Sequence, residues 1–206
     1  MPTFDDQQKT KMNKTSLTTA ALLTTAASLA SGFSITGQEI GNDVVFTYSG
    51  SINTDGLTSG GDQDVGFFET EIEAQDDEIS AIDTTRISFW ETPDATTSIT
   101  GSMGFGGEHS GSAVGDAFGV YENPTNYLII LEEGYTSGEN ITGTITFTNT
   151  SFVTLGVTDN NTVTYSWGSG GNADSIVFST VPEPSSSALW LGLITVVVSA
   201  TRRRRR

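Results

Sequence analysis

The sequence has no cysteine, and it has a single histidine, His109. Disulfide bonds and thiol chemistry are therefore excluded. His109 stands in the glycine-rich segment 104–111, where a lone histidine is more typical of a solvated side chain than of a catalyst or ligand. No G-x-S-x-G pattern singles out a nucleophilic serine, so the residues give no support to Ser-His-Asp hydrolysis.

Basic residues are also scarce, and nearly all of them lie at the two ends of the chain. Of the nine Lys and Arg, only Arg86 falls within residues 31–180, whereas all 25 Asp and Glu except Asp5, Asp6 and Glu183 do. This region therefore holds 22 acids against one base, a formal net charge of −21. Such a surface repels phosphates and anionic lipid headgroups, so we expect no nucleic acid partner for it.

Residues 1–30 contain the three parts of a secretory signal peptide. Lys14 is followed by an uncharged, moderately apolar segment, and small side chains stand at Ser28 and Ala30, three positions and one position before the expected cleavage. This order predicts export and removal of the segment that begins at Met12, with the preceding residues as an upstream extension. The alternative is an amphipathic helix rich in Ala and Leu.

Residues 181–206 combine a proline-rich tetrapeptide, an apolar segment and a basic end. Pro182 and Pro184 restrict the backbone, so a helix cannot begin before about Ser185. The uncharged segment 185–201 is close to the lower limit of about 17 residues for a transmembrane helix. The basic residues that follow should stay in the cytoplasm and leave the preceding domain outside. They are Arg202, Arg203, Arg204, Arg205 and Arg206.

The tetrapeptide Val181, Pro182, Glu183 and Pro184, followed by a short apolar helix and an arginine cluster, resembles the PEP-CTERM sorting signal of bacterial exosortase substrates. The resemblance covers residues 181–206. It implies a transient inner-membrane anchor, recognition and cleavage at the tetrapeptide by an exosortase, and delivery to the outer surface or extracellular matrix. The family is commonly linked to exopolysaccharide and biofilm formation. The alternative is a plain C-terminal membrane anchor.

Residues 31–180 are predicted to form one all-β domain. Gly, Asn and Asp separate short β-branched and aromatic runs, and the segment 141–147 alternates apolar and polar residues. We therefore expect a β-sandwich or jelly roll, similar to the small extracellular β-domains that often precede this sorting signal. The predicted strands are 43–52, 65–72, 86–90, 97–101, 127–132, 141–152, 162–167 and 175–180.

Two acidic clusters in predicted loops are candidate calcium ligands, because Ca²⁺ prefers carboxylate and carbonyl oxygens. The spacing does not match an EF-hand, and a solvated run of charges is the alternative. The candidate ligands are Asp62, Asp64, Asp76, Asp77 and Glu78.

Trp90 and Trp167 are candidates for stacking on sugar rings, with core packing as the alternative. Paired carboxylates could also support glycoside hydrolysis, but a domain with this many Asp and Glu residues contains such pairs by chance. The sequence therefore favours a non-enzymatic cell-surface or matrix protein, sorted by an exosortase and associated with exopolysaccharide. The alternative is a displayed carbohydrate-binding module or a small glycan-active enzyme.

Overall fold

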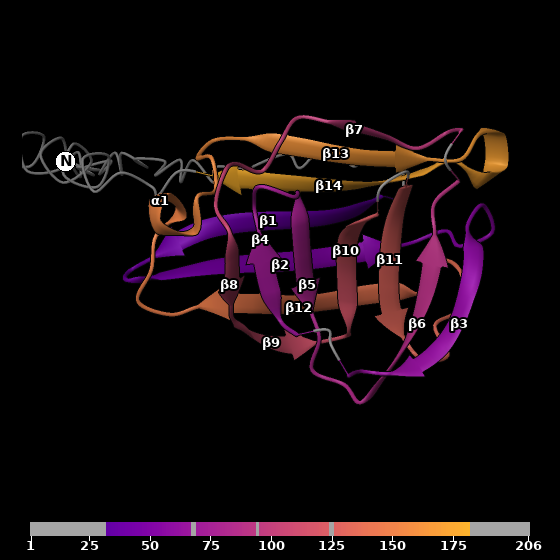
Figure 1. The fold of residues 1–206 in the computed structure, drawn as a ribbon, viewed down its shortest axis with the longest axis horizontal. Helices are drawn as coiled ribbons and strands as arrows, with labels where there is room; N and C mark the ends of the chain where they lie inside the picture. Colours follow the sequence, from indigo (N-terminus) through magenta and orange to yellow (C-terminus); the bar gives the residue numbers. More distant parts are fainter. Residues whose placement is uncertain (1–31, 67–68, 94, 124–125, 182–206) are drawn as a thin grey trace, which may run out of the picture.

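The computed structural model describes residues 32–66, 69–93, 95–123 and 126–181. These residues form fourteen strands, a short α-helix and a 3-10 helix, η1 (Gly170–Asn172). The prediction of an all-β domain is confirmed. The strands make up two seven-stranded sheets, which lie face to face as two layers (Figure 1).

The first layer, sheet A, has the strand order β7-β13-β14-β1-β2-β12-β9. Its neighbours are antiparallel except for β1 and β14, which run parallel with Phe33 opposite Ile176 and Gln38 opposite Val181. The first and last strands along the chain thus pair in the middle of the sheet. Its strands are β1 (Phe33–Ile40), β2 (Asp43–Ser51), β7 (Ser98–Thr100), β9 (Ser112–Gly115), β12 (Asn140–Phe147), β13 (Thr162–Trp167) and β14 (Asp174–Val181).

The second layer, sheet B, is antiparallel throughout, with the order β3-β6-β11-β10-β5-β4-β8. In Figure 1 its strands run across those of sheet A. Its strands are β3 (Thr58–Asp64), β4 (Glu71–Glu73), β5 (Glu78–Ala81), β6 (Arg86–Glu91), β8 (Glu108–Ser110), β10 (Phe118–Asn123) and β11 (Asn126–Glu132).

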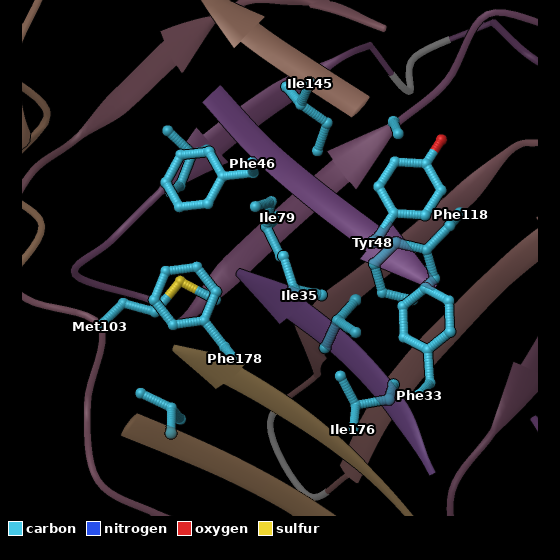
Figure 2. Close-up of a cluster of buried hydrophobic side chains, with 14 of the residues drawn as sticks. Phe33, Ile35, Phe46, Tyr48, Ile79, Met103, Phe118, Ile145, Ile176 and Phe178 are labelled. Atoms are coloured by element: carbon cyan, nitrogen blue, oxygen red, sulfur yellow. The ribbon is translucent and has the colours of Figure 1, made fainter. Parts of the chain in front are cut away.

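The main core lies between the sheets because alternate residues of each strand turn inward. The Phe33 ring of β1 lies 4.3 Å from the Phe118 ring of β10, and the Tyr48 ring of β2 lies 5.8 Å from the same ring. These aromatic contacts join the two layers (Figure 2). Burial of each such side chain stabilises the fold by about 1.5–3 kcal/mol.

The predicted strand 65–72 agrees with the structure only at Glu71 and Ile72, which belong to β4. Strand β3 ends before Val65, and β4 begins only at Glu71. The Val65 backbone N–H donates to the Thr85 carbonyl, and its side chain packs on a second apolar cluster formed by Ile82, Ile87, Tyr121 and Ile130. The apolar character of Val65 thus serves packing in a connecting segment.

The predicted strand 141–152 is too long. Strand β12 ends at Phe147, and Asn149 takes the left-handed conformation with φ 52°. The Ser151 side chain then accepts from the Thr154 backbone N–H and caps the helix α1 (Phe152–Leu155). Six of the observed strands are absent from the prediction: β1, β3, β5, β8, β9 and β10.

Candidate functional site

The outward surface of sheet B carries a row of glutamates at one edge. Glu108 of β8 lies directly opposite Glu73 of β4, and Glu73 lies directly opposite Glu78 of β5. Ile72 and Ile79, which precede Glu73 and follow Glu78, are fully buried in the core, so the three glutamates project to the other side. We call Glu108, Glu73 and Glu78 the acidic row.

Like charges directly opposite each other on neighbouring strands destabilise a sheet. Burial, supported by the negative charges of Glu73, Asp76 and Glu71, raises the pKa of Glu78 to about 7, although a hydrogen bond from the Glu122 backbone opposes the shift. Burial likewise raises the pKa of Glu71. Glu78 therefore exchanges its proton near neutral pH, where ordinary carboxyls are fully ionised.

Tyr121 of β10 extends this network toward the middle of sheet B. Its hydroxyl lies 3.0 Å from the Glu71 carboxylate and 2.8 Å from the Ser80 hydroxyl. Burial raises the Tyr121 pKa far above its ordinary value, so the phenol keeps its proton. Sequence reasoning missed Glu71, Glu73 and Glu108, because only the strand register brings them together.

The proposed calcium ligands Asp76, Asp77 and Glu78 lie where β4 turns into β5. Asp77 takes a left-handed conformation with φ 55°, and its carboxylate accepts from the Met103 backbone N–H. The Glu78 carboxylate accepts from the Glu122 backbone N–H at 2.8 Å. Two of these three carboxylates are thus engaged in holding the turn against other segments.

Asp62 and Asp64 lie in strand β3 and not in a loop, which corrects that prediction. The Asp62 carboxylate accepts from the Ser88 hydroxyl at 2.5 Å, and the Asp64 carboxylate lies 3.7 Å from the Arg86 guanidinium. Strands β6, β11 and β10 separate β3 from β5, a spacing of roughly 19 Å at about 4.8 Å per strand. The two clusters therefore do not meet, and no three His, Asp or Glu side chains of the described residues form a group that could hold a metal ion.

Trp167 is only 2% exposed and belongs to the main core, so it fits the alternative of core packing and not sugar stacking. The alternation that places Val163 and Tyr165 inward also places Trp167 inward, because all three stand at alternate positions of β13. Trp90 is partly buried and packs against the same core from β6. His109 lies in β8 opposite Ile72, half-buried at the edge of sheet B.

The predicted sorting signal and signal peptide fall almost entirely outside the described residues. Val181 is the exception, because it is the last residue of β14. Pro182, Glu183, Pro184 and the arginine cluster lie beyond the described part of the chain. Within that part, no helix has the length and apolar character needed to cross a membrane.

Comparison with known proteins identifies no relative. No family model, curated protein or solved structure matches the chain.

Proposed function

We propose that this chain is an exported, non-enzymatic protein of the bacterial cell surface or extracellular matrix. An exosortase sorts it through the C-terminal signal, and the mature domain associates with exopolysaccharide. The N-terminal segment directs export, and the C-terminal helix holds the protein in the inner membrane until the tetrapeptide is processed.

The observation that carries this proposal is the agreement between the folded domain and the two predicted processing points. Strand β1 begins at Phe33, just after the predicted cleavage that follows Ala30. Strand β14 ends at Val181, the first residue of the predicted tetrapeptide. Cleavage at both points would therefore leave the pairing of β1 with β14 almost entire.

The charge of the domain agrees with a position outside the inner membrane. Residues 31–180 carry a formal net charge of −21, whereas five arginines end the chain. The arginines resist translocation, and the acidic domain is repelled by the anionic lipid surface that they occupy. The proline-rich tetrapeptide would then be held between the two, in reach of a membrane enzyme.

The test is replacement of Pro182, Glu183 and Pro184 by alanine in a host that has an exosortase. We expect export to remain intact, while the uncleaved protein accumulates in the inner membrane, because the enzyme no longer recognises an extended tetrapeptide. Fractionation and mass spectrometry of the C-terminus measure both effects. Pro93→Ala, a proline in the connection after β6, is the matched control and should be processed normally. Normal C-terminal processing of the triple variant would overturn the proposal.

A further inference from the structure

The outward surface of sheet A is nearly free of charge, although the domain is strongly acidic. Within its described strands the one ionisable outward residue is Asp43, at the turn between β1 and β2, and Asp116 lies just past β9 at the sheet edge. Most other outward positions carry hydroxyl groups. They are Ser34, Thr36, Thr47, Ser49, Ser51, Ser98, Thr100, Ser112, Thr142, Thr144, Thr146, Thr162, Thr164, Ser166, Ser175 and Ser179. We call this surface the hydroxyl face.

Strand register arranges these hydroxyl groups in rows that cross the sheet. One row passes directly through Thr162, Ser179, Thr36, Thr47 and Thr144, which belong to β13, β14, β1, β2 and β12. Its members lie about 4.8 Å apart, and parallel rows lie about 7 Å apart along the strands. The step within a row is comparable to the advance per sugar of an extended polysaccharide chain.

Several of these hydroxyl groups are open to solvent. Thr47, Ser49 and Thr142 are exposed, and none of their hydroxyls hydrogen-bonds to another described residue. Each hydroxyl can donate one hydrogen bond and accept others, which matches the chemistry of sugar hydroxyls. Contact with an uncharged partner would desolvate no ion, so the cost of burial would be low.

We propose that the hydroxyl face binds a neutral polysaccharide, with a chain lying along a row of Ser and Thr. This deepens the proposed function and rests on it, since it assigns the association with exopolysaccharide to one surface and one class of glycan. The charge distribution favours this partner over two others. An acidic polysaccharide is repelled by the net charge of −21, and a second copy of the domain carries the same charge.

The test removes hydroxyl groups and preserves shape. In the triple variant Thr47→Val, Thr144→Val and Thr162→Val, a methyl replaces three of the five hydroxyls on the row, and none of these three hydrogen-bonds to another described residue. The full chain, purified in a non-sugar detergent, is run by affinity electrophoresis through gels containing hydroxyethyl cellulose, laminarin or dextran, and through gels containing alginate. We expect retardation by at least one neutral glucan, unchanged by added NaCl, and no retardation by alginate. Loss of three hydrogen bonds of at least about 0.5 kcal/mol each should weaken neutral binding about tenfold.

Two control variants separate hydroxyl recognition from other effects. The same three positions changed to serine keep the hydroxyls and should keep the binding. Thr58→Val changes an exposed threonine of β3 in sheet B and should have no effect. The proposal is overturned if no neutral glucan retards the wild type, if the valine variant binds as well, or if light scattering shows a dimer that the valine variant loses. The proposed function is judged separately, because the valine variant should be exported and processed normally.

Discussion

At the scale of the residue, Trp90 and Trp167 look equivalent in the sequence but have different environments. Trp167 is buried at the inner surface of β13, whereas Trp90 is partly exposed. The alternation of residues 162–167 already predicts a buried Trp167. Val163, Tyr165 and Trp167 stand at alternate positions, so their side chains lie on the same side of the strand. The side of the strand on which an aromatic side chain lies therefore separates core residues from ligand-stacking candidates better than residue type does.

Trp167→Ala should lower the free energy of unfolding by about 3–5 kcal/mol, because it opens a large cavity in the core. Trp167→Phe should cost much less, since it keeps most of the apolar volume and removes an indole N–H that has no hydrogen-bond partner among the described residues. Urea unfolding followed by circular dichroism measures both. Val153→Ala, at an 88% exposed position, is the control. Equal stability of wild type and Trp167→Ala would show that Trp167 lies outside the core.

At the scale of the element, several strands with apolar alternation could be predicted, whereas most short polar strands, and also β1 and β10, were missed. The segments 43–52, 86–90 and 162–167 lie within one residue of β2, β6 and β13. Strand β3 was missed because its sequence, TSGGDQD, has no apolar residue, and pairing with β6 alone defines it. The acidic row also could not be predicted from the sequence, because it depends on the register of β8, β4 and β5.

Glu78, within the acidic row, gives the domain a predictable dependence on pH. The pKa of Glu78 is about 7 in the folded protein against 4.5 as its ordinary value. As pH rises through this window, the unfolded chain loses the proton first, so the folded state is progressively destabilised. We expect the free energy of unfolding to be higher at pH 5 than at pH 8. Screening by solvent limits the share of Glu78 to about 1 kcal/mol.

Glu78→Gln removes this ionisation and retains an acceptor for the Glu122 backbone N–H. We therefore expect the variant to be more stable than wild type at pH 8 and about equal at pH 5. Urea titrations at both pH values provide the measurement. Glu91→Gln, at an exposed position of β6, controls for the general loss of one negative charge. If both variants gain the same stability at pH 8, the effect comes from the lower net charge and not from the position of Glu78 in the acidic row.

At the scale of the whole molecule, the sequence predicted how much charge the domain carries but not where it lies. Composition alone gives −21 for residues 31–180. The fold places the acidic row on sheet B and leaves the outward surface of sheet A almost neutral. One layer thus bears strong mutual repulsion, while the other can approach an uncharged surface at little electrostatic cost.

This repulsion should make stability depend on ionic strength. The Debye length falls from about 30 Å at 0.01 M salt, comparable with the size of the domain, to about 8 Å at 0.15 M. Two like charges 10 Å apart repel by about 0.4 kcal/mol in water, and screening removes much of this for many pairs at once. Raising NaCl from 10 to 150 mM should therefore increase the free energy of unfolding by about 1 kcal/mol or more, as measured by urea unfolding at pH 8.

Adding calcium in the same experiment distinguishes general screening from a specific calcium site. Screening acts through ionic strength, so CaCl₂ and NaCl of equal ionic strength should stabilise the domain to a similar extent, as should MgCl₂. An additional stabilisation by CaCl₂ that saturates with concentration would instead reveal a specific site, since binding to the folded state alone adds RT ln(1 + [L]/Kd). Asp76→Asn, in the turn between β4 and β5, should then weaken the additional stabilisation by calcium. Asp62→Asn, whose carboxylate accepts from the Ser88 hydroxyl, should leave that stabilisation unchanged. Destabilisation of the domain by added salt of any kind would contradict the repulsion argument itself.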